Sequence, residues 1–137
     1  MLKRYLRYAW ASPTSLLGLL CASLLLVTGA GARTVDGVLE VSGGWLASKL
    51  THLSSFSALT LGHVVLGHSV DCLQQLRAHE HVHVRQAERW GILFIPAYLL
   101  AGAWQAICGR HAYYDNPFER EAFAAEAQSA KECDTRP

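Results

Sequence analysis

The sequence predicts an α+β protein that is mainly α-helical, with a small β-hairpin or sheet and a transmembrane helix at its N-terminus. Three observations predict this class. Residues 8–32 form an apolar run without a charged side chain. Short segments in which polar and apolar residues alternate follow this run, as in half-buried strands. The second half of the chain carries long segments without glycine or proline and with apolar residues at helical spacing.

Composition narrows the class of protein further. The 137 residues suffice for one compact domain, and 51% of them are hydrophobic while 17% are charged. Soluble domains usually have about 25% charged residues, so we expect a membrane to cover part of the apolar surface. The 12 basic and 11 acidic residues almost balance, which gives no positive footprint for nucleic-acid binding. The high hydrophobicity argues against a disordered chain.

The N-terminal segment, residues 1–33, is predicted to be a membrane anchor or a signal-like segment. Its uncharged run exceeds the about 20 apolar residues that a helix needs to cross a bilayer. Lys3, Arg4 and Arg7 precede the run, so the positive-inside rule places the N-terminus in the cytoplasm and the domain outside. A cleaved signal peptide is the alternative, because residues 30–32 (Ala-Gly-Ala) have the form of a cleavage site.

Two strands and a short helix are expected next. Residues 34–42 alternate polar and apolar side chains, and residues 58–66 have a similar strand-like composition. Glycines follow both segments. Each is predicted to be a single strand. Residues 45–56 lie between them, with apolar residues at helix-like spacing, and are predicted to form a short amphipathic helix.

The remainder of the chain is predicted to be helical. A helix is expected from Ser69 or Asp71 to Trp90, with Gly91 as its stop. Residues 90–109 are again uncharged and are expected to form a helix that packs against the preceding one and partly faces lipid, although they could also span the membrane. A final helix is expected from residues 116–117 to about residue 130, followed by a polar tail, residues 131–137.

The four cysteines contain no C-x-x-C pair, which excludes a zinc ribbon or a thioredoxin-like motif. Cys21 lies in the apolar run and is expected to be a small buried apolar residue. A disulfide among Cys72, Cys108 and Cys133 is left open by their spacing.

The feature with the clearest chemistry is the segment His79-Glu80-His81-Val82-His83, which fits H-E-x-x-H. Residues four apart lie on one face of a helix, so His79 and His83 can offer two imidazoles to one Zn²⁺. Glu80 is rotated from the first ligand by about 100°, where it can act as the general base for an attacking water. The alternative is a solvated helix face that is rich in histidine, and His81 is expected to be solvated in either case.

A zinc site of this kind needs a third protein ligand. Arg89 stands where a third histidine would follow six residues after His83, so we expect a carboxylate from a later helix. Glu119 is the first candidate, Glu121 the second and Asp115 a further alternative. Glu119 also falls three residues after Asn116, where a glutamate serves as part of a helix capping box.

Other polar residues are weaker candidates. Tyr113 and Tyr114 could stabilise an oxyanion in a tetrahedral intermediate, with simple packing as the alternative. Three further histidines, His63, His68 and His111, could act in the same way.

Residues 60–66 together with residues 76–86 resemble the T-x-G … L-x-A-H-E-x-x-H-V-x-Q core of small bacterial zinc metallopeptidases. The segment Glu119-Arg120-Glu121-Ala122 is similar to the E-x-x-A-D element of gluzincin-type proteases, including the membrane-embedded CAAX-protease and heat-shock-protease group. The resemblance covers about residues 58–126. It implies a minimal zincin-like domain in residues 34–130.

In those families the first glutamate of the element binds zinc, which maps onto Glu119. The aspartate of the element commonly orients a histidine ligand, but Phe123 stands in its place here. We therefore expect another group, such as Glu126 or Asp115, to take the supporting role. The departure also leaves open a degenerate site.

We expect a zinc metalloendopeptidase of the bacterial inner membrane, with its domain outside the cytoplasm and a peptide or protein as substrate. Zn²⁺ is the expected cofactor, and no nucleic-acid partner is expected. One alternative is a non-catalytic membrane-associated interaction protein with a degenerate or structural zinc site, and another is a histidine-rich metal carrier. If residues 91–108 crossed the membrane, Glu119 would lie on the opposite side from His79, so the distance between them tests the proposal.

Overall fold

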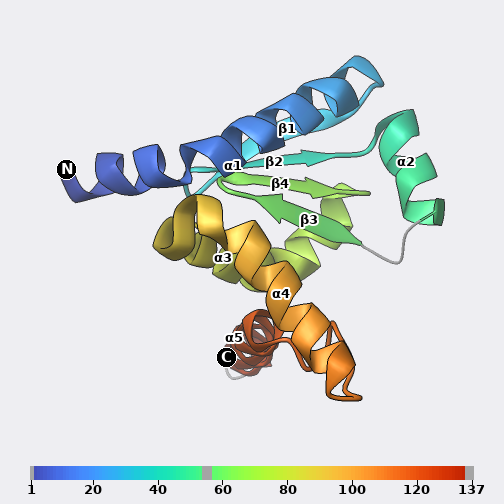
Figure 1. Ribbon diagram of the computed structural model, residues 1–137. Helices are drawn as coiled ribbons and strands as arrows, with labels where there is room; N and C mark the ends of the chain where they lie inside the picture. Colours follow the sequence, from blue (N-terminus) through green and yellow to red (C-terminus); the bar gives the residue numbers. More distant parts are fainter. Residues whose placement is uncertain (1, 54–56, 135–137) are drawn as a thin grey trace.

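The structure is a computed structural model that describes residues 2–53 and 57–134 (Figure 1). Its elements follow one another in the order α1 (Leu2–Val27), β1 (Gly31–Val35), β2 (Val38–Ser42), α2 (Gly44–Leu53), β3 (Ala58–Leu61), β4 (Val64–Gly67), α3 (Val70–Trp90), the 3₁₀ turn η1 (Gly91–Leu93), α4 (Phe94–Ile107) and α5 (Pro117–Asp134). The described part is mostly helical with one small mixed sheet, which confirms the predicted α+β class. Two parts of the predictions lie outside the described residues. They are the end of the short helix expected over residues 45–56 and residues 135–137 of the polar tail.

The sheet has the strand order β1-β2-β4-β3. The strands β1 and β2 are antiparallel, β2 and β4 are parallel, and β4 and β3 are antiparallel. The prediction of two single strands was therefore wrong, because each segment folds back on itself as a hairpin. The first reverses at Asp36 and Gly37, both with positive φ (51° and 82°), which suits the two-residue turn that Asp-Gly favours. The second reverses at Gly62, with φ 62°.

Different helices cover the two faces of the sheet: α1 and α2 lie on one face and α3 lies on the other (Figure 1). Alternation along each strand explains this arrangement, since successive side chains point to opposite faces. The buried residues on the first face are Ala22, Leu25, Val41, Ala47 and Val64. Those on the second face are Val38, Val65, Leu73 and Val84.

Helix α1 is attached to the sheet by close contacts along its length. A Cβ atom at Gly18 would lie 2.7 Å from the carbonyl oxygen of Leu61, so only glycine permits this approach. The backbone N–H of His63 donates to Ser15 Oγ at 3.1 Å. The segment expected to be an anchor thus forms one wall of the core.

An ion pair joins α3 to the other face of the sheet. The Glu40 side chain on β2 is almost fully buried, and its carboxylate accepts from Arg77 Nε at 2.8 Å and from Arg33 Nε at 2.7 Å. Burial alone would raise the pKa of Glu40, but Arg77 and Arg33 outweigh it and hold that pKa below its ordinary value. Because a buried carboxylate without partners is costly, Arg77 holds α3 against β2, and Arg33 holds β1 against β2.

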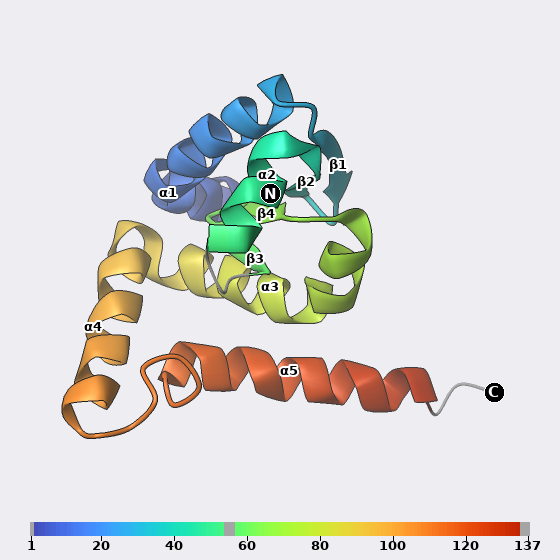
Figure 2. The same cartoon turned by 90° about the vertical axis from the view of Figure 1, so that its right-hand side faces the viewer.

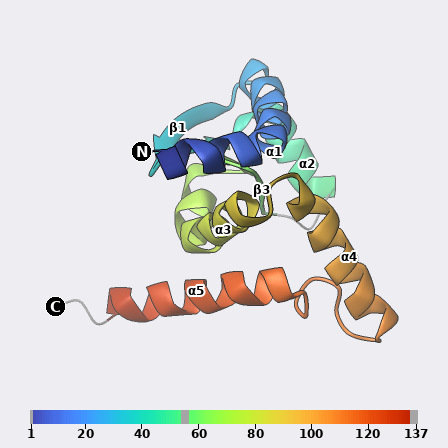
Figure 3. The same cartoon turned by 60° about the vertical axis from the view of Figure 1, so that its left-hand side comes forward.

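The ends of α3 follow local signals in the sequence. Ser69 caps its first turn, where the Cys72 N–H donates to Ser69 Oγ at 3.2 Å. Gly91, with φ 58°, ends it as predicted. Helix α4 then leads away from α3, and α5 returns alongside α3 (Figures 2 and 3).

Three cysteines are described, and Cys21, Cys72 and Cys108 are free thiols. Cys133 lies outside the described side chains. A disulfide that involves Cys133 stays a prediction.

The contact at Gly18 can be tested by replacing this glycine. In a free helix Gly→Ala stabilises by about 1 kcal/mol, but here the added Cβ meets backbone. We therefore expect Gly18→Ala to lower the free energy of unfolding by about 1–3 kcal/mol, as overpacking does. Chemical denaturation of the full chain in mild detergent measures this change. The control is Gly31→Ala, because a Cβ at that glycine meets nothing within 4 Å. A stabilising Gly18→Ala would contradict the packing of α1 on the sheet.

Candidate metal centre

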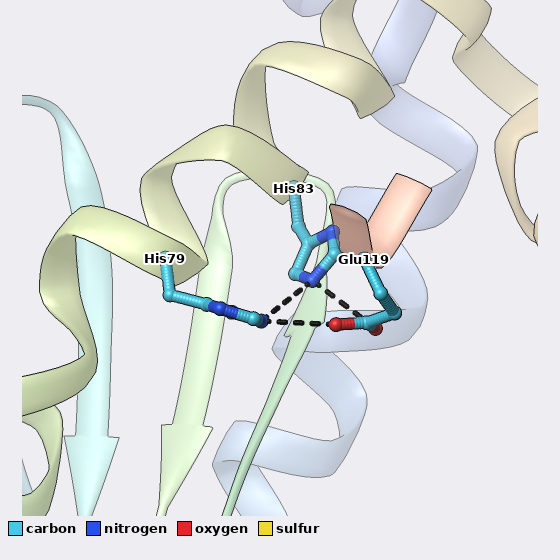
Figure 4. A group of neighbouring side chains, drawn as sticks. All are labelled: His79, His83 and Glu119. Carbon is cyan, nitrogen blue, oxygen red and sulfur yellow. Dashed lines mark hydrogen bonds and ion pairs between the residues drawn. The ribbon is translucent and has the colours of Figure 1, made fainter. Parts of the chain in front are cut away.

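Two histidines of one helix and a glutamate of another meet in the interior of the protein (Figure 4). His79 and His83 lie one turn apart on the buried side of α3, and their Nε2 atoms are 3.2 Å apart. Glu119, in the first turn of α5, places Oε2 3.1 Å from His79 Nε2 and Oε1 3.4 Å from His83 Nε2. The structure thus brings together the three residues that the sequence analysis ranked first as ligands.

The donor set fits a metal ion. Ligand atoms about 2.0–2.1 Å from a tetrahedral zinc ion lie about 3.3 Å from one another, close to the three separations seen here. Glu119 Oε2 is buried and accepts no hydrogen bond, although it lies near His79. The Nε2 atoms of His79 and His83 face each other at 3.2 Å, a distance at which at most one of them can carry a proton. A cation between the three residues would be bound by both nitrogens and would give Glu119 Oε2 a partner.

Asn116 determines where Glu119 lies, because it caps the N-terminus of α5. Its Oδ1 accepts the Phe118 N–H at 3.1 Å, and its Nδ2 donates to the Tyr98 carbonyl oxygen at 3.1 Å. Glu119 falls at the predicted third position of the helix. Its carboxylate nevertheless turns to the histidines and not back to the cap.

The surroundings of Glu119 favour its ionised form. Burial alone would raise the pKa of Glu119, but the contacts with His79, His83 and Tyr98 hold the pKa well below its ordinary value. The Tyr98 hydroxyl donates to Glu119 Oε1 at 2.5 Å. Burial and the nearby Glu119 charge raise the pKa of Tyr98, so its hydroxyl keeps its proton at neutral pH.

Glu80 lies beside the cluster without joining it. Burial raises the pKa of Glu80 above its ordinary value, although the Thr60 hydroxyl, which donates to Glu80 Oε2 at 2.6 Å, acts in the opposite direction. A raised pKa suits a group that must take up a proton near neutral pH. Glu80 and the three ligand residues all line one pocket of about 230 Å³.

Gln86 contacts the cluster and was not singled out as a site residue by the sequence analysis. It is 1% exposed, and its Oε1 lies 2.9 Å from His83 Nδ1. Its Nε2 donates to the Phe118 carbonyl oxygen at 3.0 Å and to Glu121 Oε2 at 2.9 Å. Because both acceptors face Gln86 Nε2, the Gln86 Oε1 atom must accept the hydrogen bond from His83 Nδ1. In the neutral imidazole this leaves the lone pair of His83 Nε2 free for a metal. Its position three residues after His83, on the same helix face, was the available signal.

Phe123 and Glu126 of α5 lie beside His79. The Phe123 ring packs edge-on against the His79 ring, with centroids 4.9 Å apart. Glu126 Oε2 lies 3.3 Å from His79 Nδ1, whereas Asp115 accepts the backbone N–H of His111 at 2.8 Å. Of the two carboxylates considered for the supporting role, Glu126 is the one that lies near His79.

The structure places the remaining carboxylate and tyrosine candidates around the cluster. Glu121 is exposed and contacts Gln86, not the histidines. Tyr114 is 61% exposed and its ring stacks on Phe123. Tyr113 is half-buried, and burial followed by the Glu119 charge raises its pKa.

The other histidines lie elsewhere. His63 contacts Ser15 and Glu88, which ties the turn between β3 and β4 to α1 and α3. His81 was expected to be solvated, but it is half-buried with a buried Nε2, and burial lowers its pKa. His68 and His111 are exposed.

Comparison of the chain with protein-family models gives no match, and comparisons with curated proteins and with solved structures give no significant match either.

The role of Gln86 can be tested by its effect on metal affinity. Gln86→Leu leaves His83 Nδ1 without its acceptor, so we expect zinc affinity to fall by about 10–100-fold, as is typical for loss of such a partner. Competition with a zinc chelator measures the affinity. The matched control is Gln105→Leu, which removes another buried glutamine, from α4. Equal zinc affinity in the two variants would contradict this role.

Proposed function

We propose that the protein is a membrane-associated zinc metallopeptidase that hydrolyses peptide bonds. The observation that carries this proposal is the convergence of His79, His83 and Glu119 beside Glu80 in one pocket. Three protein ligands leave one tetrahedral position open, which is the arrangement of catalytic zinc sites, whereas structural sites have four protein ligands.

The residues around the cluster can perform the steps of hydrolysis. A bound zinc ion supplies Lewis acidity and lowers the pKa of water to about 7. The Glu80 carboxylate takes the proton from the attacking water and returns it to the leaving amine. Thr60 holds this carboxylate in place, and Tyr98 holds Glu119. Tyr113 also lines the pocket, and its hydroxyl interacts with Glu119.

The pocket and the sheet suit an extended peptide. In the described sheet, strand β3 lies at an end of the order, so one of its backbone edges has no strand partner there, and we expect a substrate strand to pair with it. The pocket beside it has largely apolar walls, contributed by Leu59, Leu61, Phe94, Ile95 and Leu99. A peptide with an apolar side chain next to the scissile bond is therefore the preferred substrate.

Association with a membrane, which we assign to the bacterial inner membrane, is supported by α1. Two helical segments, Ala9–Val27 and Val70–Ile107, are long and apolar enough to cross a membrane, although a signal sequence or a core helix has the same properties. The second segment is interrupted at η1, and α4 has 14 residues. Such a helix is about 21 Å long, shorter than the about 30 Å of a hydrocarbon core. The membrane proposal therefore depends on α1.

The catalytic proposal is tested by three substitutions in the H-E-x-x-H segment. We expect His79→Ala to abolish stoichiometric zinc binding and peptide hydrolysis, because it removes a ligand. We expect Glu80→Gln to retain zinc and to lower kcat by at least about 10²-fold, since it removes the general base. His81→Ala should preserve both. Metal analysis and cleavage of a peptide library measure these effects.

The outcome separates the proposal from its alternatives. The parent protein could bind zinc and cleave no peptide, with no activity changed by Glu80→Gln. That result would favour a structural zinc site in a non-catalytic protein. The replacement of the expected aspartate by Phe123 is the observation that favours that alternative. Loss of zinc in His81→Ala would favour a histidine-rich metal carrier.

The contact between Thr60 and Glu80 leads to a further prediction. Thr60→Val removes the hydroxyl at nearly constant shape, and we expect kcat to fall by about tenfold or more while zinc content is unchanged, because a hydrogen bond to a charged group contributes about 1.5–3 kcal/mol. Steady-state kinetics on the cleaved peptide measures this. Thr60→Ser keeps the hydroxyl and should retain most of the activity. Equal kcat in the valine variant and the parent would contradict the positioning role of Thr60.

A further inference from the structure

We propose that α1 lies in the plane of the membrane and does not cross it, with the outer sides of α1 and α4 in contact with lipid. The inference rests on the membrane association proposed above but not on the peptidase activity. It concerns a surface defined here as the apolar flank. The exposed large apolar residues of the flank are Trp10, Leu16, Leu17, Leu19, Leu20, Leu24, Leu26 and Val27 of α1, and Ile92, Leu93, Leu99, Leu100, Trp104 and Ile107 of η1 and α4.

The inner side of α1 is covered along nearly the whole candidate span, by η1 and α3 near its start and by the sheet from Gly18 onward. Ala11, Ala22 and Leu25 are at most 5% exposed, and Gly18 touches the backbone of β3. These contacts run from one end of Ala9–Val27 almost to the other. The sheet must therefore lie at the same depth in the membrane as α1 itself.

A sheet at that depth is incompatible with a crossing helix. Strand β1 is at an end of the strand order and pairs only with β2 in the described sheet, so its outer backbone groups need water. Open sheet edges do not occur in the hydrocarbon region, because each unpaired backbone group would cost several kcal/mol. The charged group formed by Arg33, Glu40 and Arg77 would have to enter the membrane as well. An in-plane α1 avoids both costs.

The two parts of the flank belong to one side of the molecule. The Trp10 ring lies against Gly91, where α3 ends and η1 begins. Figure 2 shows α1 and α4 along the same margin of the molecule, with the sheet, α3 and α5 on their other side. Neither residues 8–32 nor residues 90–109 contain a charged side chain, so these two segments contribute no charge to this surface.

The chemistry of the flank and its surroundings favours lipid as the occupant over a second copy of the chain. Lys3, Arg4 and Arg7 precede the flank in the sequence and provide the positive charge that attracts anionic headgroups. Trp10, Trp90 and Trp104 are each more than 40% exposed, and tryptophan is enriched at the headgroup level. An apolar face combined with basic residues is characteristic of helices that lie in the interface.

Vesicle binding tests the flank. The full chain is purified in detergent, mixed with vesicles of phosphatidylcholine and phosphatidylglycerol, and sedimented. We expect Leu20→Glu and Leu100→Glu, at positions 69% and 71% exposed, each to weaken binding by at least about tenfold. The matched control is Val70→Glu, which adds the same charge at an exposed apolar position on α3 and should bind like the parent.

A topology experiment tests the orientation of α1. One epitope tag is placed at the N-terminus and another at the C-terminus, and bacterial spheroplasts are treated with protease. An in-plane α1 leaves both tags on one side, so both are cleaved or both are protected. Opposite fates of the two tags would overturn the in-plane arrangement and favour a crossing helix.

The remaining outcomes distinguish the parts of the proposal. Failure of the parent chain to bind vesicles would overturn the membrane association and with it this inference, but not the peptidase activity, which is measured separately. Equal loss of binding in Val70→Glu would overturn the assignment of the flank. Weakened self-association of Leu20→Glu and Leu100→Glu in sedimentation, with unchanged vesicle binding, would identify a second copy as the occupant.

Discussion

The contact between the buried Glu119 carboxylate and the two histidines is the interaction on which the arrangement of the site depends. A carboxylate that is 2% exposed must be compensated, and His79, His83 and Tyr98 provide that compensation. The contact also determines where the last helix lies, because Glu119 can reach α3 only when the first turn of α5 packs against it. Two further contacts support this position: Asn116, just before α5, donates to the Tyr98 carbonyl oxygen on α4, and Gln86 on α3 donates to the Phe118 carbonyl oxygen.

Helix α3 is the central element because it has a different partner on each side. Toward the sheet it forms the ion pair with Glu40 and the apolar contacts of Leu73 and Val84. Toward α5 it presents the histidines. The strand order places β3 at the edge of the sheet, next to the turn of α3 that carries Glu80, so Thr60 can reach this carboxylate. The site therefore lies where the sheet, α3 and α5 meet.

The apolar N-terminal helix has two roles that its composition alone does not separate. Its small residues, among them Gly18 and Ala22, allow close approach to the sheet, and its exposed leucines lie on the opposite side, whereas Leu25 is buried in the core. A helix that is apolar on all sides is expected both for a membrane span and for a helix between a core and a lipid surface. The proposed in-plane arrangement follows from this division of its two sides.

The sequence by itself determined the features that depend on neighbours within a few residues. These include the spacing of His79 and His83, the cap at Ser69 and the stop at Gly91, because helix geometry and capping are local. The turn signals at Asp36-Gly37 and Gly62 were also present, but the apolar alternation around them suggested continuous strands. The sequence ranked Glu119 ahead of Glu121, and the structure places Glu119 beside the histidines, although the pattern of a single helix could not show which carboxylate faces them.

Only the tertiary structure decided the partners that lie far apart in the chain. Thr60 reaches Glu80 because β3 lies beside α3, and Gln86 reaches the start of α5 because α4 brings that helix back. The burial of Glu40 depends on two arginines from different elements. Such contacts result from the packing of whole helices and strands. Residue type and local spacing do not specify this packing.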